Sequence, residues 1–409
     1  MAPTETGIID SLLKVARKRV QTHGTPGNGS STAAEAANKP ARRREAEASD
    51  FAAVVALKTR YGLSPDSPEN WDRLWLVNPA LSQAKQPLSM GWVQEADGEI
   101  VGYMGSIPLL YQYGDQTMVA AATTCYVAEP GYRAGSLGLI GSFFRQQGCD
   151  LFLDTTAGVP AGKIMRGFKA EPMPQKDCDT VFFWVLNSQA FLRAAMEKLQ
   201  VARGLGKFAS WLGSPVLKAD ILFRGRWPKR TAERFSCRVL RIEEIDGDFQ
   251  DLWMRKVQER PRLMACRTPE ILRWHFLTPN SRRRNHVLAC FHERRLAGYL
   301  ILQTGLAGPH GLRKAIVADL IAIGGHPGVI AELFAGAYEL AKKEGSDLLE
   351  AEGFPEEVRR VFQTWSPFNR RFPGWPFYYK TDRTPLRELL THEESWYACP
   401  FDGDTTLSA

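Results

Sequence analysis

The sequence of 409 residues is 44% hydrophobic and 24% charged, and its 52 Lys and Arg against 45 Asp and Glu give a formal net charge of +7. This composition is ordinary for a soluble globular protein, and the length fits two domains of common size better than one. No apolar run approaches the roughly 20 residues that cross a bilayer, and the N-terminus lacks the apolar stretch of a secretory signal, so we expect a cytoplasmic protein.

The distribution of charge and of cysteine argues against two further classes. The basic residues do not gather on one recognition element, which argues against nucleic-acid binding. A polyanionic small molecule is an equally natural partner for a mildly basic enzyme. The seven cysteines are scattered and odd in number, without a CxxC pair or a tight Cys/His group. They predict reduced thiols, with neither a disulfide framework nor a metal site.

Residues 1–47 are predicted to precede the folded part. The apolar residues between Ile8 and Val20 form a rough helical stripe with Lys and Arg elsewhere. This pattern is typical of a basic amphipathic helix that lies peripherally on the inner face of a membrane or docks on a partner, and a frayed helix without a role is the alternative. Residues 22–47 contain no Val, Ile, Leu, Met or aromatic residue, so we expect a disordered linker there.

From residue 48 onward, helix and strand signals alternate, and the pattern occurs twice. Four short segments recur in the same order at offsets of 195 to 197 residues: EIVGYM at Glu99 and RLAGYL at Arg295, PG at Pro130 and Pro327, DLFL at Asp150 and DLLE at Asp347, and FFW at Phe182 and FYY at Phe377. Such a series indicates two copies of one fold. We expect domains at 48–190 and 235–395, a partly helical connection at 191–234 and a tail at 396–409.

The sequence pattern of each copy predicts the same order of elements, beginning with a helix and a β-hairpin. A third strand, a helix, a fourth strand, a short helix and a last aromatic strand follow. The predicted helix, hairpin, third strand and fourth strand are residues 51–61, 90–108, 118–127 and 151–155 in copy one, and 249–257, 287–304, 315–323 and 348–351 in copy two. The fold class is therefore α+β, with two tandem domains, each a mixed, mostly antiparallel sheet with helices on its faces.

The junction after the third strand of copy one is the segment most suited to binding a ligand. A strand ends at Val127, a Pro/Gly turn follows, and a basic residue and several small residues lead into an amphipathic helix. Small residues at a helix N-terminus leave backbone N–H groups uncovered, and these groups suit a pyrophosphate. The predicted cradle consists of Val127, Arg133, Ala134, Gly135, Ser136, Leu137 and Gly138. An ordinary strand-to-helix turn is the alternative.

This segment resembles the signature of the GCN5-related N-acetyltransferases, in which a strand and a Pro-containing turn lead into Arg/Gln-x-x-Gly-x-Gly/Ala. Arg133, Ser136 and Gly138 stand at the signature positions, with Ser136 in place of the usual Gly. Residues 161–168, AGKIMRGF, resemble the later motif of the family. The resemblance implies acetyl-CoA or another acyl-CoA as co-substrate and a small-molecule amine as acceptor. Lys163 replaces the family's usual Tyr and Thr156 its usual Asn, so the resemblance is stronger in fold than in catalytic residues.

Copy two lacks this loop. The residues that match Arg133 and Gly138 are Ile330 and Ala335, so copy two has neither the basic entrance nor the run of small residues. In tandem members of this superfamily, one half often binds the acyl donor and the other shapes the acceptor site. We therefore expect copy one to bind the donor.

Acyl transfer to an amine requires a base, a polarised thioester carbonyl and a proton for the leaving thiolate. Glu129, just past the third strand, is the candidate base, and Tyr126 on that strand and Lys163 are the candidate proton donors. The candidate acceptor-site groups are Asp154, His275 and Asp319. The structural alternatives are an exposed loop carboxylate for Glu129, a core aromatic for Tyr126 and a satisfied structural histidine for His275.

The end of the chain contains Asp402-Gly403-Asp404, which lacks the further oxygen ligands of a calcium loop and is predicted to be a turn. A tail of this kind resembles those of bacterial acetyltransferase-like proteins encoded with surface-polysaccharide genes, which implies an amino sugar as acceptor. Two alternatives stay open. One is a relative of the aminoacyl transferases that use charged tRNA, and the other is a non-catalytic binding or scaffold protein. The sequence does not determine the oligomeric state.

Overall fold

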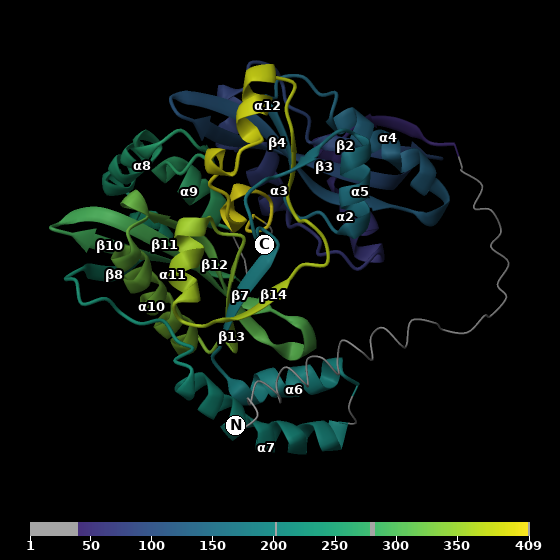
Figure 1. The fold of residues 1–409 in the computed structure, drawn as a ribbon. Helices are drawn as coiled ribbons and strands as arrows, with labels where there is room; N and C mark the ends of the chain where they lie inside the picture. Colours follow the sequence, from purple (N-terminus) through teal and green to yellow (C-terminus); the bar gives the residue numbers. More distant parts are fainter. Residues whose placement is uncertain (1–39, 201–202, 279–282, 408–409) are drawn as a thin grey trace.

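The computed structural model describes residues 40–200, 203–278 and 283–407. Two β-sheets form the body, and the C-terminal segment, yellow in Figure 1, runs between them. The predicted amphipathic helix between Ile8 and Val20 lies outside the described residues.

The first sheet has the strand order β1-β2-β3-β4-β5-β15-β6, with β9 beside β3. Its strands are β1 (Arg42–Glu45), β2 (Gly91–Ala96), β3 (Glu99–Tyr113), β4 (Gln116–Ala128), β5 (Leu151–Asp154), β6 (Glu171–Pro172), β9 (Leu263–Ala265) and β15 (Tyr378–Lys380). The accompanying helices are α2 (Phe51–Arg60), α3 (Pro68–Trp75), α4 (Arg133–Phe143) and α5 (Val159–Gly167). Helix α4 packs because its apolar residues recur at helical spacing, which buries Leu139, Ile140 and Phe143 against Trp92 and Phe152.

The second sheet has the strand order β14-β7-β13-β12-β11-β10-β8. Its strands are β7 (Thr180–Val185), β8 (Ser236–Leu240), β10 (Arg284–His292), β11 (Arg295–Ala307), β12 (Arg313–Ala322), β13 (Leu348–Glu352) and β14 (Phe368–Arg371). The remaining α-helices are α6 (Ser188–Lys198), α7 (Arg203–Phe223), α8 (Gly247–Glu259), α9 (Pro269–Phe276), α10 (Pro327–Lys343), α11 (Glu356–Gln363) and α12 (Thr384–Leu390).

The predicted fold class is confirmed, and both hairpins, both third strands and both fourth strands form where the sequence places them. The last strands differ from the prediction because the two halves exchange them. Strand β7 of copy one pairs antiparallel with β13 of the second sheet, and β15 of copy two pairs antiparallel with β5 of the first. An apolar strand pattern predicts burial without specifying the partner strand, so a local pattern does not reveal this exchange.

The ordered part also begins earlier than predicted. Residues 42–45, which we assigned to the disordered linker, form edge strand β1 and pair antiparallel with β2. The strand needs no apolar pattern, because backbone hydrogen bonds and ion pairs hold it in place. Arg44 contacts Asp50 at 2.7 and 2.8 Å and Glu95 at 2.8 Å. The rest of the predicted linker up to residue 39 lies outside the described residues.

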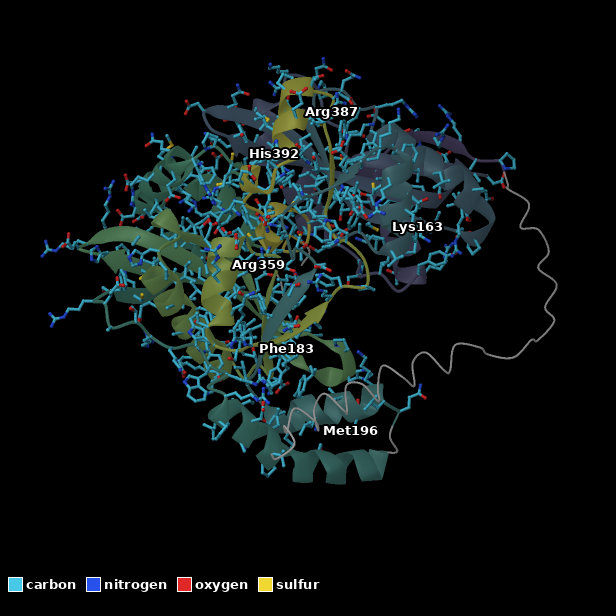
Figure 2. The ribbon with its side chains drawn as sticks, in the orientation of Figure 1. Lys163, Phe183, Met196, Arg359, Arg387 and His392 are labelled. Atoms are coloured by element: carbon cyan, nitrogen blue, oxygen red, sulfur yellow. The ribbon has the colours of Figure 1, made fainter. Side chains whose placement is uncertain are left out.

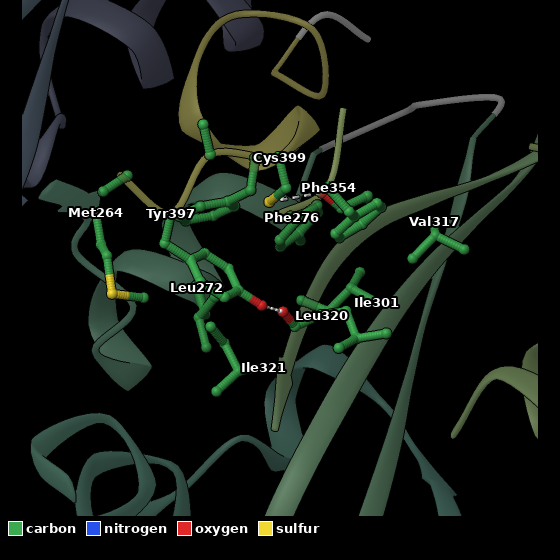
Figure 3. Packing of buried hydrophobic residues seen from close by; sticks show 14 of the residues in the cluster. Met264, Leu272, Phe276, Ile301, Val317, Leu320, Ile321, Phe354, Tyr397 and Cys399 are labelled. Atoms are coloured by element: carbon green, nitrogen blue, oxygen red, sulfur yellow. Dashed lines mark hydrogen bonds between the residues drawn. The ribbon is translucent and has the colours of Figure 1, made fainter. Parts of the chain in front are cut away.

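One continuous core joins the two sheets, and the C-terminal tail is part of it. The tail residues Trp396, Tyr397, Phe401 and Leu407 are each no more than 2% exposed and belong to the same apolar cluster as both sheets. Figure 3 shows the side chain of Tyr397 among apolar residues of the second half. The tail, predicted as a separate segment, is therefore a structural connection between the halves.

Candidate functional site

The first sheet opens between β4 and β5. These two strands run parallel and pair only where Ala120–Ala122 face Leu151–Leu153. Strand β4 then continues to Ala128, while β5 ends at Asp154. Within the described residues, no strand pairs with this last part of β4 on the β5 side. The backbone of β4 beyond Ala122 thus lines an opening at the carboxyl ends of two parallel strands, a usual place for a ligand.

A β-bulge explains the opening. Met104 of β3 pairs with Tyr126 and the adjacent Gly105 pairs with Thr124, so Cys125 has no partner and adopts a φ of 48°. A bulge of this kind bends its strand and increases the local twist, which turns β4 away from β5. Burial raises the pKa of the Cys125 thiol to about 11, so the thiol stays protonated at neutral pH.

The first turn of α4 lies next to this opening and is uncovered. Arg133 is the first residue of the helix, and Arg133 and Ala134 are both exposed. Ser136 is buried beneath them and donates a hydrogen bond to the Arg133 carbonyl oxygen at 2.7 Å. The Tyr126 hydroxyl lies 2.5 Å from the Ser136 hydroxyl and ties the end of β4 to the helix. Uncovered N–H groups and the positive helix end make this turn suited to an anion.

The rest of the predicted cradle lies further along α4. Leu137 is 43% exposed, Gly135 and Gly138 are half-buried, and Val127 is buried on β4. The absence of a side chain at Gly138 makes room for Arg43 of β1, because a Cβ atom at residue 138 would lie 1.9 Å from an Arg43 Nη atom. Arg43 was not among the predicted site residues, because its strand lies in the segment predicted to be a linker.

A buried and a half-buried carboxylate, Asp154 and Asp404, lie on the other side of the opening. Asp154 is 7% exposed at the tip of β5, and burial, followed by the charge of Asp404, raises its pKa to about 7. Asp404 comes from the C-terminal tail and accepts hydrogen bonds from Thr155 at 3.1 Å and Thr156 at 3.4 Å. Burial raises the pKa of Asp404 as well. The charge of Asp404 opposes ionisation of Asp154, so Asp154 can take up and release a proton near neutral pH.

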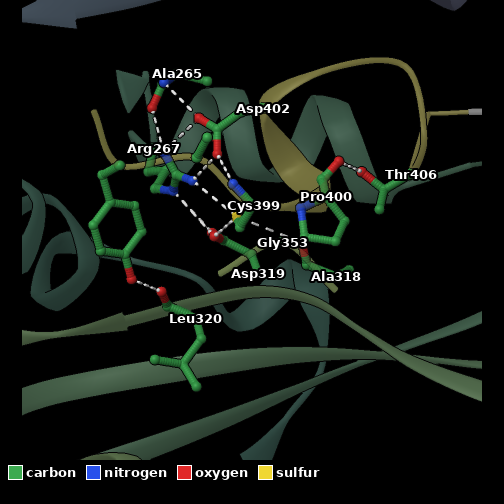
Figure 4. Close-up of polar contacts among 12 residues, drawn as sticks. Ala265, Arg267, Ala318, Asp319, Leu320, Gly353, Cys399, Pro400, Asp402 and Thr406 are labelled. Atoms are coloured by element: carbon green, nitrogen blue, oxygen red, sulfur yellow. Dashed lines mark hydrogen bonds and ion pairs between the residues drawn. The ribbon is translucent and has the colours of Figure 1, made fainter. Parts of the chain in front are cut away.

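In the second sheet, the tail fills the corresponding opening. Strand β12 pairs with β13 only at residues 314–316, and the tail continues along β12 from there. The Tyr397 hydroxyl donates to the Leu320 carbonyl oxygen, and the Cys399 thiol contacts Asp319 at 3.2 Å (Figures 3 and 4). The place that is open in copy one therefore belongs to the protein core in copy two.

The start of α10, the helix of copy two that corresponds to α4, is covered too. Glu332 on its first turns accepts hydrogen bonds from the Thr231 backbone at 2.9 Å and from Arg230 at 2.6 Å. Gly328 lies against Phe235 and Glu233, and Ile330 and Ala335 are buried. A helix start enclosed by its own chain is not available to a pyrophosphate, which agrees with the missing loop in the sequence.

His275 and Asp319, predicted acceptor-site groups, lie instead in the buried network that anchors the tail. Arg267 contacts Asp319 at 3.1 Å and Asp402 at 2.9 Å, and all three side chains are at most 1% exposed (Figure 4). His275 Nε2 lies 2.7 Å from the Thr406 hydroxyl, and burial lowers the pKa of His275 well below its usual range. The C-terminal tail covers His275 and Asp319, so neither residue lines an open cleft as predicted.

The two other predicted catalytic groups lie nearer the surface. Glu129 forms an ion pair with Arg60 at the end of α2, so its carboxylate already has a cationic partner. Lys163 is exposed on α5 (Figure 2). Of the sequence-predicted site residues, the structure brings Tyr126 and the α4 turn to one side of the opening and Asp154 to the other. Asp404, which the sequence assigned to a turn, joins them from the other end of the chain.

A cavity of about 440 Å³ between the sheets extends to the two threonines that hydrogen-bond to Asp404. Thr155 and Thr156 line one part of it, and Glu350 and Glu352 of β13 line another. Glu350 is ion-paired with Lys314 at 2.7 Å and Arg370 at 3.2 Å. Burial, and next the charge of Glu350, raise the pKa of Glu352 to about 7. The cavity therefore combines these two carboxylates with three basic residues, Lys314, Arg370 and Arg283, and lies beside the threonines that hold Asp404.

Comparison with known proteins places the fold. A scan against family models and a search of curated proteins found no match. Among solved structures, a probable N-acyltransferase from Enterococcus faecalis is similar over 84% of this chain and 73% of its own, at 9% identity and a TM-score of 0.54. A GCN5-related N-acetyltransferase from Anabaena variabilis is similar over 84% and 73%, at 9% identity and a TM-score of 0.52.

N-myristoyltransferase from Saccharomyces cerevisiae, with bound myristoyl-CoA and inhibitors, is similar over 87% of this chain and 81% of its own, at 12% identity and a TM-score of 0.51. The fold is that of the GCN5-related acyltransferases. Identities this low show the fold alone, so an activity for this chain has to rest on the geometry of its own site.

Proposed function

We propose that the chain is an acyl-CoA-dependent N-acyltransferase with its donor site in copy one. The observation that carries this proposal is the opening between β4 and β5, where an exposed helix start and two carboxylates, one buried and one half-buried, lie beside the free edge of β4. Two residues of β4 connect the parts. Thr124 hydrogen-bonds to Asp404, and Tyr126 hydrogen-bonds to Ser136 of α4.

The donor would bind along this edge. Its pyrophosphate would lie on the first turn of α4, where N–H groups, Arg133 and Arg43 supply positive charge. The pantetheine chain would follow β4 beyond Ala122, whose backbone groups on that side have no strand partner among the described residues. This orientation directs the thioester toward Asp154 and Asp404.

The reaction then requires few groups. Asp404, coupled to Asp154, accepts the proton of the attacking amine, the N–C bond forms and the C–S bond breaks. The leaving thiolate takes a proton from Tyr126, whose pKa burial raises, or from Lys163. Glu129 is the weaker choice as base because Arg60 holds it.

The acceptor would enter through the cavity between the sheets. Its amine would approach Asp404 past Thr155 and Thr156, which line that cavity. Acetyl as the transferred group and an amino sugar as the acceptor are the specific form of the proposal, and both rest on the resemblance seen in the sequence.

The test is acyl transfer by the full chain. Acetyl-CoA and longer acyl-CoA donors are offered with a panel of amines that includes amino sugars, and release of free thiol is measured. We expect amine-dependent release that falls by at least roughly 100-fold in Asp404→Asn, the usual size of a general-base contribution. Coenzyme A affinity, measured by calorimetry, should stay within about twofold.

Glu129→Gln is the matched control, because it removes the competing carboxylate without touching the pair. It should keep most of the turnover. Two results would overturn the proposal: no binding of coenzyme A at millimolar concentration, or equal turnover by Asp404→Asn and the native chain. A thermal shift with tRNA and not with coenzyme A would favour the aminoacyl transferase alternative.

A further inference from the structure

Helices α6 and α7 form a hairpin beside the second sheet, at the bottom of Figure 1. One face of α7 packs on that sheet. Leu217 is buried and Ile221 half-buried in a small cluster with Val185, Leu348 and Phe368. Ser214, three residues before Leu217, is buried as well. This stripe accounts for the packing of α7 on the body.

The opposite face of α7 is also apolar, and it is exposed. Pro215, Val216, Ala219, Leu222 and Phe223 are all exposed and follow the spacing i, i+1, i+4, i+7, i+8 of a single helical stripe. The exposed fractions are 58% for Val216, 68% for Leu222 and 95% for Phe223. The value of Phe223 is the highest of any large hydrophobic residue in the described part of the chain. A helix that is apolar on two faces normally buries both.

The same region carries a strong positive charge. Between Ser188 and Arg230 the sequence has nine Lys and Arg against two Asp and Glu, a surplus of seven, of which Arg230 is paired with Glu332 of α10. Lys218 is exposed beside the stripe, and Arg224 and Lys229 are exposed just beyond its end. Asp220 is ion-paired with both Arg224 and Arg226 and so compensates only one of these two cations.

We propose that this face of α7 docks on an anionic lipid bilayer, with Leu222 and Phe223 in the interfacial region and the basic residues at the headgroups. An exposed apolar stripe flanked by Lys and Arg is the pattern of a helix that lies in the membrane interface. Anionic headgroups attract basic side chains near the surface, which gives the charge surplus a role. No helix in the described part is long and apolar enough to span a membrane.

The test uses the full chain and two kinds of vesicle, phosphatidylcholine alone and phosphatidylcholine mixed with phosphatidylglycerol. We expect cosedimentation with the mixed vesicles only, weakened by added salt. The double variant Leu222→Ser, Phe223→Ser should bind these vesicles at least roughly tenfold more weakly, equivalent to about 1.4 kcal/mol. Both side chains are exposed, so the melting temperature should hardly change.

Val239→Ser is the matched control, since Val239 is 56% exposed on β8 at the opposite edge of the second sheet from β7 and β14. It should bind the vesicles as the native chain does. The proposal fails if the native chain ignores phosphatidylglycerol vesicles at low ionic strength, or if the double variant binds them equally well. It also fails if the native chain is a dimer in size-exclusion chromatography that the double variant converts to a monomer, because the stripe would then face a second copy.

Discussion

The uncovered first turn of α4 allows a variant that should strengthen the fold while it weakens donor binding. Ala134 is exposed in this turn, which contains no acidic residue. Ala134→Asp adds a carboxylate near the positive end of the helix, which stabilises a helix by about 0.3–1 kcal/mol. The same carboxylate would face the pyrophosphate of the proposed donor.

The size of the loss follows from Coulomb's law. Two unit charges about 5 Å apart repel by about 0.8 kcal/mol in bulk water and by about 3 kcal/mol at the effective dielectric constant near a protein surface. Salt at physiological concentration screens part of this at an exposed helix end. We therefore expect a loss of about 1.5 kcal/mol, roughly a tenfold rise in the dissociation constant of coenzyme A.

Calorimetry with coenzyme A and thermal melting of the same samples measure the two effects separately. Gln189→Asp is the matched control, because Gln189 is exposed in the first turn of α6, which also lacks an acidic residue. It should gain similar stability and leave coenzyme A affinity unchanged. Unchanged coenzyme A affinity in Ala134→Asp would refute the assignment of the pyrophosphate to this turn.

Two further predictions concern the buried charges. Because burial raises the pKa of Asp154 to about 7, and Asp154 neighbours the proposed base Asp404, kcat/KM of the native chain should rise with pH up to about 7, and Asp154→Asn should shift this limb because Asp404 then titrates without its neighbour. The pKa of Asp154 in the folded state also exceeds the unfolded value of about 3.9, so the free energy of unfolding should fall as pH rises from about 4 to 7, and it should fall less in the variant. Equal urea midpoints of the two chains across this range would count against the shifted pKa. Arg267→Met leaves Asp319 and Asp402 buried without their cation and should lower the free energy of unfolding in urea by about 3–5 kcal/mol. The control Arg295→Met removes an exposed ion pair and should lower it by less than about 1 kcal/mol. Similar losses in the two variants would mean that the tail network is not a main support of the fold.

Much of the fold could be predicted from the sequence, because helices and strands depend on local spacing. The hairpin at β2 and β3, the strand β4 and the small residues at the start of α4 each have a signal within a few residues. The asymmetry between the copies is local too, since Ile330 and Ala335 replace Arg133 and Gly138. The structure adds the physical reason, which is that α10 begins under Thr231 and Phe235.

The candidate base was missed because it depends on where the chain ends in space. Asp404 hydrogen-bonds to Thr155 across 249 residues, and only the path of the tail between the sheets brings it to Asp154. The same path buries His275 and Asp319, which the sequence had placed at an open cleft. A residue's own neighbours in sequence do not encode this path.

The sequence by itself determined most of the elements, their order and the helix start at which we propose that the donor binds, because each depends on side-chain spacing and on backbone conformations set within one turn or strand. Only the tertiary structure decided which sheet β7 and β15 join, that β1 pairs with β2, and which opening the tail fills. Those outcomes depend on competition between distant partners for the same strand edges and the same apolar space. The tail occupies the opening beside β12, whereas in copy one it reaches Thr155 with Asp404 and leaves the first turn of α4 exposed.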